Sequence, residues 1–273
     1  MPELPEVETT KRGIEPFLKN ATVRNIIVRN PNLRWKVDPE LAVILKNQKV
    51  KGICRRAKYL LLAFDKGTLI LHLGMSGSLR VVTKNIAVEK HDHIDICLDN
   101  EKIIRFRDPR RFGSVLWTEG AIENHRLLNR LGPEPLEENF HGDYLFASTR
   151  GRKRAIKQHI MDNHIVVGVG NIYASESLFK AGIHPGASCN QLSKQSLVRL
   201  SNEIKNILQA AIEQGGTTLK DFSNVEGQPG YFAQKLYVYG RKNEPCLICT
   251  TKIEQITQGQ RSSYFCAKCQ KSR

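Results

Sequence analysis

The chain has 273 residues, of which 40% are hydrophobic and 25% charged, a composition typical of a globular protein large enough to bury its own core. It contains no run of about 18 apolar residues, and its acidic, proline-punctuated N-terminus is unlike a signal peptide, so neither a membrane span nor secretion is expected. The net charge of +15 makes nucleic acid the leading candidate partner, with a merely basic or ribosome-associated protein as the alternative.

The first predicted element is an amphipathic helix that opens at Pro5. Proline suits the first helical turn, where Glu6 and Glu8 also complement the positive end of the helix dipole. Apolar side chains then recur on one helical face, at Val7, Ile14, Phe17 and Leu18. From residue 21 to about 118 the pattern changes to short β-rich runs, which is typical of an antiparallel sandwich or barrel. The clearest predicted strands are 24–28, 59–64, 68–73, 93–98, 102–107 and 114–117.

A segment rich in proline and glycine at 132–135 predicts a linker, and the pattern beyond it is helical. The glycine turn at 168–171 follows residues with a helical pattern and opens another helix, whose N–H groups could hold a phosphate. A further helix is capped by Ser193 or Ser196 and stopped by Gly215-Gly216. Its apolar face is formed by Leu197, Leu200, Ile204, Leu208 and Ile212. A flexible stretch is predicted at 224–230.

The strongest local motif consists of two Cys-x2-Cys pairs separated by 16 residues: Cys246, Cys249, Cys266 and Cys269. Such pairs form knuckles with room for a β-hairpin between them, and four thiolates close a tetrahedral, structural zinc site. Two redox-active pairs are the alternative. The other cysteines sit singly and are predicted to be inert small hydrophobes, which together with the metal motif favours a reducing, intracellular compartment.

The N-terminus is the second motif. Removal of the initiator Met, which is usual before a small residue, would leave Pro2 as a secondary amine. An α-amine has a pKa of about 8, compared with about 10.4 for lysine, so it is partly unprotonated at neutral pH and can attack an electrophilic sugar carbon. Glu3 beside it could act as an acid or base. The alternative is that Pro2 and Pro5 only stiffen the start of the helix.

Other motifs each carry a structural alternative. Met75 at the crest of a glycine-flanked loop, and Arg110 and Phe112 in the turn 108–113, could wedge into a base stack or could simply pack in the core. The basic run 150–157 resembles a phosphate-contacting patch, or a solvated helix face. Lys58 before a strand could be a catalyst or a strand-edge charge. The His91-Asp92-His93 run could ligate a metal, but no other ligand set accompanies it, so contact with DNA or core packing is favoured. Arg261 could be presented by a predicted hairpin tip or could be a surface charge.

Taken together, these motifs resemble those of the bacterial formamidopyrimidine-DNA glycosylases, also called 8-oxoguanine DNA glycosylases/AP lyases. The resemblance covers essentially the whole chain and is carried by residues 1–9, 56–60, 72–77, 90–93, 108–113, 131–135, 170–176, 215–217 and the four cysteines. It implies an α+β fold, in which an N-terminal helix and an antiparallel β-sandwich precede a helical domain with a helix–two-turns–helix motif and a C-terminal β-hairpin zinc finger. The implied domains are 1–132, a linker at 133–141, 142–235 and 236–273.

The resemblance also implies the reaction. The expected partner is double-stranded DNA that contains an oxidised purine, held by a monomer with one structural zinc ion in the bacterial cytoplasm, at the nucleoid. Pro2 would attack C1′ of the damaged nucleotide, Glu3 would be the acid that helps open the sugar, and Lys58 would donate a proton during β-elimination. Arg261 on the zinc hairpin would contact DNA and assist δ-elimination.

The same resemblance implies a set of DNA contacts. Met75, Arg110 and Phe112 match an inserted triad, with Arg110 facing the orphaned cytosine. The residues that match DNA-backbone contacts are His91, Arg152, Lys157 and Asn171. The loop 217–232 would close over the flipped base. Two departures stand out, since threonine follows Cys249 where the family commonly has glycine, and Gln158 replaces a common proline.

Two other functions remain as alternatives. One is endonuclease VIII, a related enzyme for oxidised pyrimidines, which usually has glycine where Leu4 stands and lacks the triad of Met75, Arg110 and Phe112. The other is a DNA-binding protein without catalysis, which the intact Pro2 and its predicted partners argue against.

Overall fold

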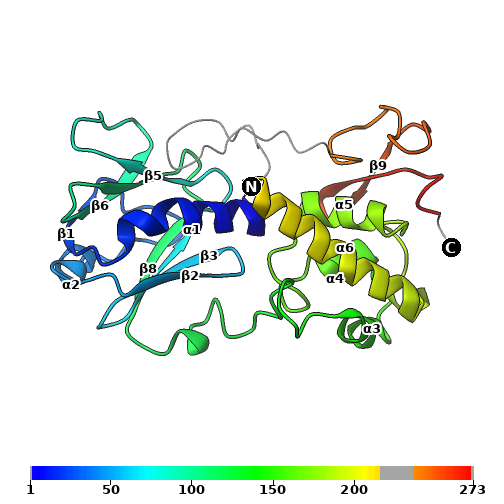
Figure 1. Ribbon diagram of the computed structural model, residues 1–273, viewed down its shortest axis with the longest axis horizontal. Helices are drawn as coiled ribbons and strands as arrows, with labels where there is room; N and C mark the ends of the chain where they lie inside the picture. Colours follow the sequence, from blue (N-terminus) through cyan, green and yellow to red (C-terminus); the bar gives the residue numbers. More distant parts are fainter. Residues whose placement is uncertain (1, 216–235, 272–273) are drawn as a thin grey trace. The chain divides into compact units, whose positions relative to one another are not determined.

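The computed structural model describes residues 2–215 and 236–271, and these divide into two compact units (Figure 1). Of the described residues, unit 1 holds 2–129 and 214–215, and unit 2 holds 130–213 and 236–271. The stretch predicted to be flexible at 224–230 and the loop 217–232 lie outside the described residues. The finer domain limits given above stay a prediction.

Unit 1 begins with helix α1 (Leu4–Leu18), one residue earlier than the sequence pattern indicates. Glu3 is its N-cap, and the Glu3 N–H donates to the Glu6 carboxylate at 2.8 Å, which is half of a capping box. Pro5 therefore occupies the second helical position, where the N–H that proline lacks would have no intrahelical partner. The predicted apolar face is confirmed, because Val7, Ile14 and Leu18 are all buried.

Two antiparallel four-stranded sheets follow. The first has the order β1 (Val23–Val28), β6 (Asp92–Leu98), β7 (Ile103–Arg107) and β5 (Ser78–Val82), and the second has β2 (Gly52–Arg56), β3 (Tyr59–Ala63), β4 (Thr68–His72) and β8 (Ser114–Thr118). Strand β5 is not among the clearest predicted strands, because its alternation is interrupted where two valines follow each other at its end. The sequence pattern missed the short helices α2 (Leu41–Leu45) and η1 (Ile122–Asn124).

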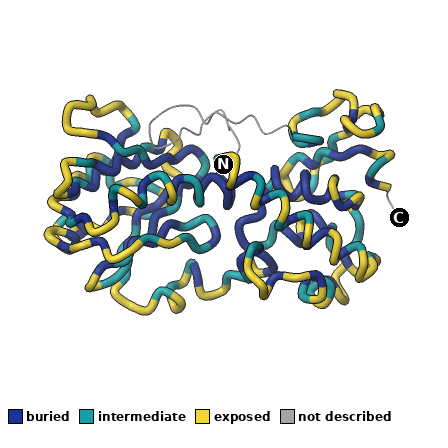
Figure 2. The backbone as a smooth tube through the Cα atoms, in the orientation of Figure 1, coloured by how far each residue is buried: buried dark blue, intermediate teal, exposed yellow. Residues whose placement is uncertain are grey.

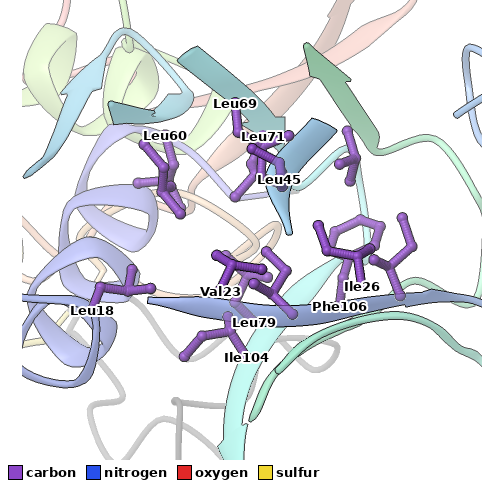
Figure 3. Close-up of a cluster of buried hydrophobic side chains, with 14 of the residues drawn as sticks. Leu18, Val23, Ile26, Leu45, Leu60, Leu69, Leu71, Leu79, Ile104 and Phe106 are labelled. Atoms are coloured by element: carbon purple, nitrogen blue, oxygen red, sulfur yellow. The ribbon is translucent and has the colours of Figure 1, made fainter. Parts of the chain in front are cut away.

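One hydrophobic core holds unit 1 together. Figure 3 shows side chains of β1 and β7, such as Val23 and Phe106, near Leu60 and Leu71 of β3 and β4. Helix α1 packs against β2, β3 and β5, and contributes Leu18 to the same cluster. Each fully buried aliphatic side chain stabilises such a core by about 1.5–3 kcal/mol. The exposed residues are concentrated in the connecting loops (Figure 2).

Unit 2 is helical, with α3 (Gly142–Thr149), α4 (Ile156–Ile160), α5 (Asn171–Lys180), η2 (Cys189–Gln191) and α6 (Lys194–Glu213). The predicted apolar face of α6 is buried against α3 and α5. Its cap is Ser193, whose hydroxyl accepts the Ser196 N–H at 3.2 Å. The helical pattern before Gly168 is misleading, because residues 161–167 form turns in which the Asp162 carboxylate accepts the His164 N–H at 3.0 Å.

A hairpin of β9 (Glu254–Gln258) and β10 (Arg261–Phe265) completes unit 2. Its two-residue turn has positive φ at Gly259 (54°) and Gln260 (62°), which matches the right-handed twist of the strands. The hairpin and the cysteine knuckles share a small core that includes Phe179, Val238 and Ile253, with Tyr264 of β10 packed against it. Within residues 2–215 and 236–271, no helix combines the length and apolar character needed to cross a membrane.

Candidate active site and zinc centre

The N-terminal residues lie at the start of α1, where Pro2 and Glu3 are both buried. The next turn of the helix fixes the neighbouring hairpin, because Glu8 accepts the Arg55 Nε–H at 3.0 Å. Burial raises the pKa of Glu8, but the Arg55 guanidinium offsets this and lowers it overall. Arg55 also donates to the carbonyl oxygen of Ala57 at 3.0 Å. The helix and the β2–β3 turn that carries Lys58 are therefore joined through one arginine.

Lys58 follows Ala57, whose φ of 53° makes the sharp turn between β2 and β3. The charge of Lys58 acts on His72 of β4, whose pKa is lowered to about 4, first by burial and then by the charges of Lys58 and Arg34. The His72 Nδ1 accepts the Gly74 N–H at 3.0 Å. At neutral pH the imidazole is therefore uncharged, and its Nε2–H is a donor. No local sequence signal marks Arg34, whereas His72 opens one of the matching motifs.

A cavity of about 770 Å³ in unit 1 brings the three predicted wedge residues together. Its lining includes Met75, Arg110 and Phe112, with His72 and Arg34 on other parts of the wall. Phe112 is 44% exposed, and the Arg110 guanidinium lies 5.0 Å from the centre of its ring. Core packing is therefore the wrong explanation for Phe112. The half-buried Met75 stands on the loop between β4 and β5.

The two histidines of the His-Asp-His run differ in environment. His93 is buried, and its Nε2 bonds the carbonyl oxygen of Asp108 at 2.8 Å. His91 is half-buried, with its ring centre 6.4 Å from that of His93. Only His91 therefore remains a candidate for contact with a ligand.

In unit 2, Lys157 is buried to 1% exposure, and its ammonium group donates to three protein acceptors. These are Asn171 Oδ1 at 2.7 Å, the Ser262 carbonyl at 2.9 Å and Ser263 Oγ at 2.8 Å. The Asn171 Nδ2 donates to the same Ser262 carbonyl at 3.1 Å. Lys157 and Asn171 thus join α4 and α5 to strand β10, which Arg261 begins. A cavity of about 210 Å³ is lined by the buried Lys157 and the exposed Arg261, together with Gln158 and Gly259.

We expect Lys157→Met to lower the free energy of unfolding of unit 2 by about 2–4 kcal/mol, because buried hydrogen bonds to a charged group are lost and their acceptors stay desolvated. The change should appear in thermal denaturation and in faster amide hydrogen exchange over 261–265. Lys153→Met, at an exposed lysine of the same segment, is the matched control. Equal stability of the two variants would contradict the role of Lys157 as a link to the hairpin.

The basic run before α4 separates into two kinds of residue. Arg150 folds back on the protein, where its Nη2 donates to the carbonyl oxygens of Cys189 at 3.1 Å and Leu192 at 3.0 Å. Its guanidinium also lies 4.1 Å from the centre of the Phe146 ring. Arg152 is exposed. Only part of the predicted patch therefore presents its charge outward.

Glu176 is a structural anchor that the sequence analysis did not single out. It is 3% exposed and accepts backbone N–H groups from Tyr237 at 2.8 Å, Val238 at 3.0 Å and Tyr239 at 2.8 Å. Burial raises its pKa. Its position in the matching motif 170–176 was the available signal. The carboxyl group fixes the start of the segment that leads into the cysteine knuckles.

The four cysteine Sγ atoms all lie within 4.8 Å of one another. Cys246 and Cys269 are 3.9 Å apart and Cys249 and Cys266 are 3.4 Å apart, close to the sulfur–sulfur edge of about 3.8 Å implied by Zn–S bonds of about 2.3 Å in a tetrahedron. Each of these close sulfur pairs contains one cysteine from each Cys-x2-Cys knuckle, which favours a shared metal over two separate redox-active knuckles. The residues fit one structural zinc ion, which would hold the hairpin and both knuckles together.

The departure after Cys249 has a visible geometric consequence. Thr250 has a φ of 62°, in the left-handed region that glycine occupies more easily. Its N–H still donates to the Cys246 carbonyl at 3.0 Å, and the Ile248 N–H approaches the Cys246 Sγ at 3.5 Å. The knuckle is therefore intact despite the threonine.

Comparison with known proteins agrees with this arrangement along the chain. Three family models match: "Formamidopyrimidine-DNA glycosylase N-terminal domain" over residues 1–115, "Formamidopyrimidine-DNA glycosylase H2TH domain" over 131–223, and "Zinc finger found in FPG and IleRS" over 243–271. A formamidopyrimidine-DNA glycosylase of Shewanella woodyi is 57% identical over 270 residues, which is 99% of each chain. One from Haemophilus influenzae is 55% identical over 271 residues and 99% of each chain.

Solved structures agree as well. The MutM (Fpg) protein of Thermus thermophilus has a TM-score of 0.88 at 33% identity, with full coverage of both chains. The Lactococcus lactis Fpg, in complex with DNA that contains an abasic site, has a TM-score of 0.90 at 33% identity and covers 99% of this chain and 100% of its own.

The helix-led β-sandwich, the helical unit and the four-cysteine hairpin define a zinc-finger protein of the helix–two-turns–helix class. The length and identity of the matches then specify the family. The chain belongs to the formamidopyrimidine-DNA glycosylase family.

Proposed function

We propose that this protein is a bifunctional DNA repair enzyme, which removes oxidised purines from duplex DNA and then cuts the strand at the vacated sugar. The observation that carries the proposal is in unit 1. The buried residues Pro2 and Glu3 precede α1. In the same unit, one cavity is lined by the exposed Phe112 and Arg110 and by the half-buried Met75. Relatives described as bound to DNA with an abasic site or with Fapy-dG support this proposal.

The proposed chemistry starts at the Pro2 nitrogen, once Met1 has been removed. The amine forms a bond to C1′ as the bond from C1′ to the damaged base breaks, and Glu3 supplies the proton that opens the sugar ring. The iminium that results withdraws electrons from C2′, so a C2′ proton can leave. Loss of the 3′ phosphate and then of the 5′ phosphate follows. Lys58 is the proposed proton donor in the first elimination, and Arg261 is proposed to assist the second.

DNA must be held with the damaged base out of the stack, because the reacting carbon is otherwise out of reach. We propose that Met75, Arg110 and Phe112 fill the vacated space, with Arg110 opposite the orphaned cytosine. The proposed backbone contacts are His91, Arg152, Lys157 and Asn171. For Lys157, three protein acceptors already surround the ammonium group, so its contribution comes mainly through the hairpin that carries Arg261. A net charge of +15 suits this polyanionic partner.

We further propose that the protein works as a monomer at the nucleoid in the cytoplasm. The proposed domains are 1–132, 142–235 and 236–273, with a linker at 133–141.

Borohydride trapping tests the proposal. The protein is incubated with a duplex that has 8-oxoguanine opposite cytosine and, separately, with a duplex that has thymine glycol. We expect a covalent adduct on the first duplex, because reduction of the iminium makes the link between protein and DNA permanent. An adduct on thymine glycol alone would assign the protein to the endonuclease VIII type. Binding without an adduct on either duplex, with Met1 confirmed absent, would overturn the catalytic proposal.

A further inference from the structure

Asp108 is a fully buried acidic residue at the first position of the turn 108–113. Its Oδ1 accepts the Ser76 hydroxyl at 2.8 Å and the Arg110 N–H at 3.3 Å, and its Oδ2 accepts the Gly113 N–H at 2.7 Å. Ser76 directly follows Met75 in the chain. One carboxyl group therefore ties the loop that carries Met75 to the turn that carries Arg110 and Phe112.

The backbone of Asp108 adds a third segment to the same centre. Its N–H donates to the His91 carbonyl at 3.1 Å, and its carbonyl oxygen bonds His93 Nε2 at 2.8 Å. The Arg111 N–H donates to that carbonyl oxygen as well, at 3.2 Å. Arg111 has a φ of 56°, so these bonds hold a turn with an unfavourable backbone conformation.

The two loops also touch directly, with no side chain between them. Gly74 has a φ of 66°, and a Cβ at this position would lie 2.4 Å from the Gly113 nitrogen and 2.4 Å from the Phe112 carbonyl carbon. A Cβ at Gly113 would lie 2.7 Å from the His72 carbonyl oxygen. Because backbone meets backbone, the loops cannot slide past each other without breaking the bonds to Asp108.

We infer that Asp108 is the positioning residue that sets the spacing of Met75, Arg110 and Phe112, and thereby the preference for the base opposite the lesion. The inference rests on the proposed function. Discrimination between bases requires donors that are already aligned with one base edge, and misalignment weakens the correct contact more than the wrong ones. Asp108 touches no reacting atom in this account and acts only through the residues that it holds.

The variants that test this are Asp108→Asn, which puts a donor where an acceptor stood, and Ser76→Ala, which removes one hydroxyl. The matched control is Asp95→Asn. Asp95 is similarly buried in unit 1, but its carboxylate pairs with Arg105 Nε at 2.8 Å and Arg29 Nη2 at 2.6 Å, and within the described residues it makes no hydrogen bond to the turn 108–113. Asp95→Asn therefore shows how far the loss of a buried carboxylate lowers the free energy of unfolding when the turn 108–113 is not touched.

Three quantities are measured for each variant: two reaction rates under single-turnover conditions and one fluorescence emission on binding. The ratio of excision rates for 8-oxoguanine opposite cytosine and opposite adenine should fall about tenfold in Asp108→Asn and less in Ser76→Ala. Lyase activity on a single-stranded abasic oligonucleotide, which needs no wedge, should stay within about twofold. Emission of 2-aminopurine opposite a tetrahydrofuran abasic analogue, which rises when the base is unstacked, should rise less in Asp108→Asn than in the unsubstituted protein.

Asp95→Asn should lower the melting temperature and leave the ratio unchanged. Unchanged ratios in folded Asp108→Asn and Ser76→Ala would overturn the inference, and so would an equal fall in Asp95→Asn. If Asp108→Asn does not fold, Ser76→Ala decides. Absence of 8-oxoguanine excision by the unsubstituted protein would overturn the proposed function, and the 2-aminopurine emission would then decide the inference without any catalysis.

Discussion

Insertion of one lysine between Met1 and Pro2 is expected to abolish the borohydride-trapped adduct, because the initiator Met is retained before a large residue and the Pro2 nitrogen becomes an amide. An amide nitrogen has no lone pair available for attack on C1′, whereas an α-amine with a pKa of about 8 has one in a useful fraction of molecules. Excision of 8-oxoguanine should fall by at least about a thousandfold, since covalent catalysis is lost rather than weakened. The measurements are trapping and single-turnover excision.

Pro2→Gly is the matched control for that insertion. It keeps a free α-amine at the same position, so a weaker adduct should remain. Affinity for a duplex with a tetrahydrofuran abasic analogue should be unchanged in both variants, because no predicted wedge or backbone contact has been altered. Full trapping by the lysine-inserted protein, with mass spectrometry confirming the extra residues, would show that another group is the nucleophile.

Loss of the zinc ion is the second large effect that we expect. Cys266→Ser removes a fully buried ligand, and apparent zinc-binding free energies of about 10–16 kcal/mol exceed what the small core around Phe179, Val238 and Ile253 can replace. The variant should contain less than one zinc per chain and should lose the ordered β9–β10 hairpin. DNA affinity should fall by about a hundredfold or more, because Arg261 and its neighbours are no longer held in place.

Metal content is measured by elemental analysis, and DNA affinity by fluorescence anisotropy at a fixed salt concentration. Cys54→Ser provides the control, because Cys54 is an exposed cysteine of β2 far from the knuckles in sequence. It should keep one zinc and full affinity. A Cys266→Ser protein with stoichiometric zinc and normal affinity would contradict the structural role of the site.

Local chemistry was the part of this protein that its sequence revealed best. The spacing of Cys246, Cys249, Cys266 and Cys269 predicts a shared metal, and the four sulfur atoms do converge. The pattern from Val7 to Leu18 predicts α1 within one residue, because a helical face is encoded by neighbours three and four positions apart. Strand β5 is not among the clearest predicted strands, because its burial depends on a partner strand that the local pattern does not show.

Short spacings in the sequence therefore determined the zinc ligands and the start of α1, whereas the fold as a whole was implied by the family resemblance. The role of Pro2 as nucleophile came from the same resemblance and stays a prediction. Only the tertiary structure revealed the buried hydrogen bonds that Lys157, Asp108 and Glu176 make, which no short spacing in the sequence indicates. The reason is that their partners are distant along the chain: Lys157 bonds Ser263 across 106 positions, Glu176 bonds Tyr239 across 63, and Asp108 bonds Ser76 across 32. A buried charge acquires its role from the groups that compensate it, and folding alone brings those groups together.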